Sequence, residues 1–248
     1  MCSSDLAGTG TVGSAGTAGL STITFVHSAA QTAGTSVTAA ADGEGAIVIN
    51  NSAATVADVT FATIGTSTAA VKSLTITDGD TKATGDVYAK SITSAAGDDF
   101  DFNGDVTAAT TLTLINGGNA NFAADVTAST NFEVTTGATT ITFDGAVDQL
   151  VTGVISADAA ARANVTNSNA AGIVTFANDI GEVGTKAATI TGATASQSVF
   201  NGKIYAGALT TVGSAKMTFD DTVTLSGALT TTNTATMTLG KAFVAGTT

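Results

Sequence analysis

The feature that most constrains the fold is a short motif that returns about every twenty residues. It reads Phe, then Asn or Asp, often Gly, one variable residue, then Val or Ile. Clear copies begin at Phe102, Phe143, Phe200 and Phe219, and looser copies at Phe122, Phe176 and Leu239. The last apolar residue of successive copies falls at Val87, Val106, Val126, Val147, Ile180, Ile204, Val223 and Phe243. The spacing is close to twenty except at one step of 33, which indicates a repeat architecture.

Each repeat predicts one coil made of short strands joined by turns. Between motif copies lie stretches with alternating apolar and polar residues, such as Leu112-Thr113-Leu114, which is the pattern of a half-buried strand. Asn-Gly and Asp-Gly are turn dipeptides because both residues tolerate positive φ. A unit of twenty residues cannot bury its apolar face alone, so it must stack on its neighbours. We therefore predict an all-β, parallel β-solenoid with inward Phe and Val/Ile ladders; the alternative is an antiparallel β-sandwich or meander built from hairpins.

Composition agrees with a stacked β-protein and excludes several functions. Proline is absent, as expected where interior strands donate hydrogen bonds to both neighbours, and about a fifth of the residues are threonine, which favours strands. The formal net charge is −12 and Arg162 is the sole arginine, so a basic surface for nucleic acid is lacking. No apolar run reaches eighteen residues, so we predict no membrane-spanning segment.

The repeat also divides the chain into segments. Residues 1–6 are predicted to be a non-native N-terminal scar, because they resemble the translation of a sequencing adapter; Cys2 would then not be native. Residues 7–20 are expected to be weakly ordered or an incomplete first coil, and residues 21–248 to form the solenoid. The long step predicts an insertion near 156–169, where an alanine-rich patch around Arg162 favours a helical turn or a loop. Both ends are expected to be cut from a longer protein.

The repeats resemble those of large bacterial surface proteins. The Phe-Asn/Asp-Gly-x-Val units and the Ala-Leu-Thr-Thr stretches at 208–211 and 228–231 are similar to passenger regions of autotransporters, including rickettsial-type outer-membrane surface antigens and related adhesins. The likeness covers the chain from about Leu74 onward. It implies a right-handed parallel β-helix displayed outside the cell. The secretion signal and C-terminal membrane barrel of that family are not in this sequence, which leaves its secretion route an inference.

The acidic residues supply the candidate metal site. If the register holds, Asp86, Asp105 and Asp125 occupy one column on successive coils. Like charges stacked about 4.8 Å apart repel each other, and Ca²⁺, which prefers oxygen ligands, would relieve that repulsion. These three residues are therefore candidate calcium ligands, with ordinary screened carboxylates as the alternative. No other cofactor is expected.

We expect no catalytic residues. The densest acidic cluster, Asp98, Asp99, Asp101 and Asp105, would be the site of a polysaccharide-acting β-helix enzyme, the remote alternative, but supporting cations and aromatic residues are scarce. His27 has no partner residues for a catalytic triad in its vicinity. Thr-x-Thr pairs recur, as at Thr140/Thr142 and Thr189/Thr191, without one clear shared column, so we interpret them as solvent-facing strand residues and not as an ice-binding array.

The sequence thus predicts a non-enzymatic structural or adhesive module, a fragment of a bacterial cell-surface or secreted repeat protein. Its location would be extracellular, and its partners a host-cell or matrix surface, or other copies of itself. The alternative is a surface-layer or matrix protein that self-assembles and depends on cations.

Overall fold

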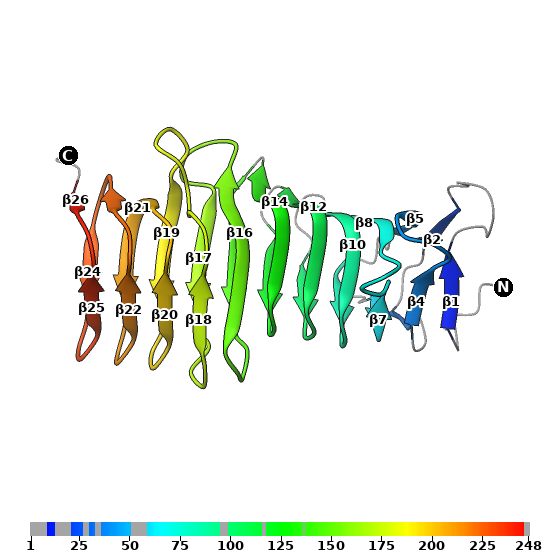
Figure 1. Cartoon of the computed structure of the whole chain (residues 1–248), viewed down its shortest axis with the longest axis horizontal. Coiled ribbons are helices and arrows are strands. Elements are labelled where there is room, and N and C mark those ends of the chain that lie inside the picture. Colours follow the sequence, from blue (N-terminus) through cyan, green and yellow to red (C-terminus); the bar gives the residue numbers. More distant parts are fainter. Residues whose placement is uncertain are drawn as a thin grey trace.

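The computed structural model shows a parallel β-solenoid of about ten coils, without a helix in the part of the chain that it describes. It describes residues 9–12, 21–26, 30–32, 36–50, 59–94, 99–115, 118–135 and 137–245. Successive coils lie side by side along the long axis, and the first and last described strands lie at opposite ends of the stack (Figure 1). The predicted all-β solenoid is therefore confirmed.

The described strands form two sheets, of 14 and of 12 strands. The first sheet contains β1 (Thr9–Val12), β2 (Thr22–Phe25), β4 (Ser36–Ala39), β5 (Glu44–Asn50), β7 (Thr63–Ile64), β8 (Val71–Asp78), β10 (Val87–Ser94), β12 (Val106–Ile115), β14 (Val126–Thr135), β16 (Gln149–Ala157), β18 (Ile173–Phe176), β20 (Gln197–Phe200), β22 (Lys216–Phe219) and β25 (Thr236–Leu239). The second sheet contains β3 (Gln31–Thr32), β6 (Val59–Phe61), β9 (Thr81–Ala83), β11 (Phe100–Phe102), β13 (Asn119–Phe122), β15 (Thr139–Phe143), β17 (Ala163–Asn167), β19 (Ala187–Gly192), β21 (Ile204–Thr211), β23 (Val223–Leu225), β24 (Leu229–Thr231) and β26 (Phe243–Ala245).

Every pair of these strands is parallel, so the antiparallel alternative is wrong for the described residues. The one antiparallel contact among them is an isolated bridge between Thr66 and Ala69 within a single turn. Strands form because apolar residues alternate with threonine or other polar residues. In β15, for example, Thr139, Ile141 and Phe143 are buried, whereas Thr140 and Thr142 are half-buried on the outer surface.

The predicted ladder of motif residues is correct in its first part and wrong at Val147. Val87, Val106 and Val126 pair in register on β10, β12 and β14. The next partner of Val126 is Val151, while Val147 is 64% exposed. The coil between Val126 and Val151 is longer than its predecessors, and this extra length moves Val147 into the connecting turn.

Beyond this point the motif lies at a different corner of the coil. In the N-terminal coils, Phe102 ends β11 in the second sheet and Val106 begins β12 in the first. In the C-terminal coils, Phe200 ends β20 in the first sheet and Ile204 begins β21 in the second. The predicted single ladder is thus two ladders. The residues that continue the Val126 column are Val151, Phe176, Phe200, Phe219 and Leu239.

The aromatic stack inside the solenoid crosses from one corner to the other at this shift. Phe122 and Phe143 stack with ring centroids 5.8 Å apart in the second sheet. Phe143 then meets Phe176 edge to face, at 5.2 Å and an interplanar angle of 85°. Phe176 and Phe200 resume parallel stacking in the first sheet, at 4.9 Å. Edge-to-face geometry is favourable for aromatic pairs, so the core stays continuous across the shift.

A buried polar network replaces phenylalanine at the next position of the second-sheet ladder after Phe143. Asn167 pairs with Phe143 in the ladder and is 2% exposed. Its amide donates to the carbonyl of Gln197 at 2.7 Å and to the hydroxyl of Ser198 at 2.8 Å. Its Oδ1 accepts the backbone N–H of Asn169 at 2.9 Å. Because these groups find partners, their burial is tolerated at the change of register.

The residues predicted as an insertion, 156–169, are largely part of the coil. They comprise the end of β16, a turn in which Arg162 pairs with Asp158 at 2.7 Å, and β17, which pairs with β15 and β19. The additional length is spread over consecutive coils. Asp125, Asp148 and Asp179 each accept a backbone N–H from the next coil, and the donors lie 25, 25 and 24 residues further along the chain. Residues 1–6 lie outside the described residues, and of 7–20 only β1 is described, paired with β4.

Candidate functional site

The three predicted aspartates form one column at a corner of the solenoid. Each directly precedes a paired strand, β10, β12 or β14. Oδ1 of Asp86 accepts the backbone N–H of Asp105 at 3.1 Å, and Oδ1 of Asp105 accepts that of Asp125 at 3.2 Å. The column ends on the N–H of Leu150, which donates to Asp125 at 2.7 Å. The predicted register of these residues is confirmed.

The same hydrogen bond, from a backbone N–H of one coil to an aspartate of the preceding coil, recurs at other corners of the stack. Oδ1 of Asp80 accepts the N–H of Asp99, and Oδ1 of Asp99 accepts the N–H of Asn119. Asp148 likewise binds the N–H of Ile173, and Asp179 that of Lys203. Where the chain turns between strands, the carboxylate of one coil therefore supplies the acceptor for a backbone donor of the next. Sequence reasoning found the spacing of the Asp86 column but not this role.

The column carries negative charge but forms no ready-made metal cage in the described part of the chain. No group of three or more histidine, cysteine, aspartate or glutamate side chains is arranged there to hold an ion. One oxygen of each column carboxylate already accepts a backbone hydrogen bond, so a calcium ion would bind through the second oxygens. At Asp86 it would compete with the Tyr88 hydroxyl, which donates to Oδ2 at 3.4 Å. Calcium at Asp86, Asp105 and Asp125 stays a prediction.

The acidic cluster proposed for catalysis is divided among different structural roles. Asp99 belongs to the second column, and Asp105 to the first. Asp101 pairs with Lys82 of the preceding coil at 2.6 Å. Asp98 and His27 lie outside the described residues, as does Cys2.

Asp105 provides a direct test of the corner hydrogen bond. Asp105→Ala should lower the free energy of unfolding by about 1 kcal/mol, because the N–H of Asp125 loses its acceptor. Asp105→Asn should change stability less, because the amide keeps an acceptor oxygen and removes one of the stacked charges. Urea unfolding followed by circular dichroism would measure both. Equal losses for the two variants would contradict a hydrogen-bonding role.

Tyr88 reports on the charge of the same column. Partial burial raises the pKa of Tyr88 above its usual value near 10, and the charges of Asp86 and Asp105 raise it further. In a Tyr205→Phe background, Tyr88 is the single tyrosine of the chain and can be titrated by ultraviolet absorbance. We expect Asp86→Asn to lower the pKa of Tyr88, because the neutral amide no longer opposes the tyrosinate. An unchanged pKa would show that Asp86 does not face this hydroxyl.

Threonines share a column more regularly than the sequence suggested. Thr142, Thr166 and Thr191 are neighbours on β15, β17 and β19, and the column continues through Thr210 and Thr230. The interpretation that the Thr-x-Thr pairs have no common column is wrong for this part of the second sheet. It failed because unequal coil lengths hide the alignment. The result is an outer surface of small polar side chains along the C-terminal half of the solenoid.

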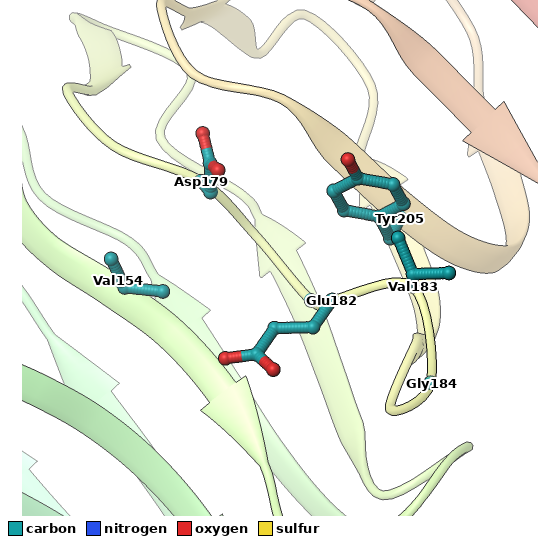
Figure 2. A pocket seen from close by; sticks show the side chains of 7 residues that line it. Val154, Asp179, Glu182, Val183, Gly184 and Tyr205 are labelled. Atoms are coloured by element: carbon teal, nitrogen blue, oxygen red, sulfur yellow. The ribbon is translucent and has the colours of Figure 1, made fainter.

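A hollow of about 450 Å³ opens on the outer surface beside these longer coils. It is formed by three successive coils, with Val154 on β16, Asp179 and Gly181 on the next coil, and Tyr205 on β21. The turn containing Glu182, Val183 and Gly184 forms its remaining wall. Figure 2 shows the Glu182 carboxylate directed toward the Val154 side and the Asp179 carboxylate directed away from it. No feature of the sequence singled out this hollow, because it depends on which coils are stacked.

The described fold defines the chain as a parallel β-solenoid repeat protein. Comparisons with protein-family models, with curated proteins and with solved structures found no match. The resemblance to autotransporter passengers therefore stands on the repeat motif alone. Among the residues that the structure covers, no helix is both long and apolar enough to span a membrane.

Proposed function

We propose that this chain is a non-enzymatic structural or adhesive module of a bacterial cell-surface or secreted repeat protein, with the right-handed coil of autotransporter passengers. The observation that supports this best is the continuous parallel stack, because such a rod holds outward side chains in a fixed array over a long distance. About ten coils spaced by 4.8 Å give a rod on the order of 50 Å long. Its location would be extracellular.

The longer coils are the part of the rod best suited to contact a partner. Their turns around residues 158–162 and 182–185 appear as the light green and yellow loops at the edge of the stack above β16 and β19 (Figure 1). The two turns are connected, because the N–H of Ala161 donates to the carbonyl of Lys186 at 2.9 Å. Loops held on a rigid scaffold frequently carry binding functions. The partner would be a host-cell or matrix surface.

An adhesion assay with coated beads tests this proposal. Beads carrying the purified chain should be retained on cultured cells or extracellular matrix more strongly than beads carrying a globular protein of equal net charge. Replacing Asp158–Arg162, the whole connection between β16 and β17, with two residues should reduce retention. The matched control is the same shortening of the Ala193–Ser196 turn. Retention equal to that of the control protein on all surfaces would reject an adhesive role.

The aspartate column favours a second candidate, a surface-layer or matrix protein that assembles with cations. Asp86, Asp105 and Asp125 stack negative charges on three coils, and a divalent cation would offset their repulsion. Millimolar calcium should then raise the melting temperature and promote ordered assemblies visible by electron microscopy, and Asp105→Asn should weaken both effects. A melting temperature that does not respond to calcium would exclude binding at this column.

A further inference from the structure

The hollow beside Tyr205 combines three kinds of surface that together suit one type of ligand. Tyr205 contributes an aromatic ring, and Val154 and Val183 contribute apolar walls. Asp179 and Glu182 contribute carboxylates. Val183 is 75% exposed, more than any other large apolar side chain among the described residues. An aromatic ring, an aliphatic wall and two acids match a cation carried on an apolar stem.

The charges of the hollow are available to an incoming group. Glu182 makes no ion pair with any described residue. The ion pairs in the described part of the chain join other acids to Lys82, Lys90, Arg162 and Lys241. Oδ1 of Asp179 accepts the N–H of Lys203, which leaves Oδ2 for a ligand. Lys203 neighbours Asp179 on the next coil and is exposed, so its flexible ammonium group can turn toward solvent when another cation binds.

Backbone hydrogen bonds hold the walls of the hollow in place before a ligand arrives. The N–H of Tyr205 donates to the carbonyl of Ile180 at 2.8 Å. The N–H of Gly181 donates to Ile155 at 2.8 Å, and its φ of 72° starts the turn. Within the turn, the N–H of Glu182 donates to Thr185 at 3.2 Å. A preformed site requires little ordering on binding, which favours affinity.

We propose that this hollow binds an arginine side chain of a partner polypeptide. The planar guanidinium group can stack on the Tyr205 ring, and the negative charges of Glu182 and Asp179 in the lining attract it. The methylene stem then packs on Val154 and Val183. Lysine fits less well, because its ammonium group is compact and strongly hydrated and has no planar face to lie on the ring. The inference rests on the proposed adhesive function and names the chemistry that its partner presents.

Peptide titration of the full chain, followed by two-dimensional NMR, tests the proposal. The probe is the capped peptide acetyl-Gly-Arg-Gly-amide, and its control contains citrulline, which has nearly the same shape without the charge. The arginine peptide should shift the amide signals of Gly181, Glu182 and Tyr205 saturably. The citrulline peptide should bind at least about fivefold more weakly, because the charged contacts are lost.

Two variants with matched controls locate the binding. Glu182→Gln and Tyr205→Val should each weaken binding of the arginine peptide by about two- to fivefold. Asp78→Asn removes the same charge from another exposed acid, and Tyr88→Val removes the other tyrosine; both should leave the affinity unchanged. Equal binding of the citrulline peptide, or equal losses in the control variants, would overturn the assignment. Because the assay uses no cells, the bead experiment decides the adhesive function separately.

Discussion

Gly202→Ala is expected to lower the free energy of unfolding by about 3 kcal/mol, one of the largest effects of a single added methyl group in this chain. A Cβ atom at Gly202 would lie 2.3 Å from the carbonyl carbon of Asn178 and 2.5 Å from the amide nitrogen of Asp179. Both atoms belong to the backbone of the preceding coil, which cannot move aside without separating two paired strands. Chemical unfolding monitored by circular dichroism would measure the loss.

Gly184→Ala is the matched control for this substitution. No heavy atom lies within 4 Å of a Cβ placed at Gly184, so its replacement should change stability by less than about 0.5 kcal/mol. If both alanine variants were equally stable, the coils could not be stacked as closely as described. Gly104 should behave like Gly202, because its Cβ would lie 2.4 Å from the carbonyl carbon of Gly85.

Phe143→Ala should destabilise the solenoid by about 3–5 kcal/mol. The Phe143 side chain is fully buried and contacts Phe122 on one side and Phe176 on the other. Its removal leaves a cavity at the point where the aromatic stack changes sheets, and neither neighbour can fill it without leaving its own ladder. Phe143→Leu should recover part of the loss, because a branched aliphatic side chain fills much of the volume.

Val147→Ala is the informative comparison for Phe143→Ala. The repeat spacing predicts that Val147 is a core residue, whereas in the structure its side chain is largely exposed. We expect Val147→Ala to change the free energy of unfolding by less than about 0.5 kcal/mol. A loss of 1 kcal/mol or more would favour the register predicted from the spacing over the observed pairing of Val126 with Val151.

Residue spacing predicted the aspartate column but neither its hydrogen bonds nor the hollow. Asp86, Asp105 and Asp125 are 19 and 20 residues apart, so the period alone places them in one column, and the structure confirms this. Their hydrogen bonds to the backbone of the next coil could not be predicted, because they depend on the direction of N–H groups at a turn. The hollow was not predictable either, since Val154, Asp179 and Tyr205 fall in coils of unequal length.

The sequence by itself determined that this protein is a stacked all-β repeat with phenylalanine and valine or isoleucine inside. A twenty-residue unit with one apolar face must pack on its neighbours to exclude water from that face. Tolerance of positive φ is the expected reason for the glycine of the motif, and that explanation is wrong for two copies. Gly104 and Gly202 are not among the residues with positive φ; they are glycine because the neighbouring coil is too close for a side chain.

Only the tertiary structure decided which residues stack on one another. Val126 pairs with Val151, and Phe143 with Asn167, because the coil lengthens there and the motif moves to another corner. A local pattern records which residues prefer the interior but not how many residues each turn uses. The position of every outward side chain, including the Tyr205 hollow and the threonine column, follows from that count of residues per coil and is settled by packing between coils.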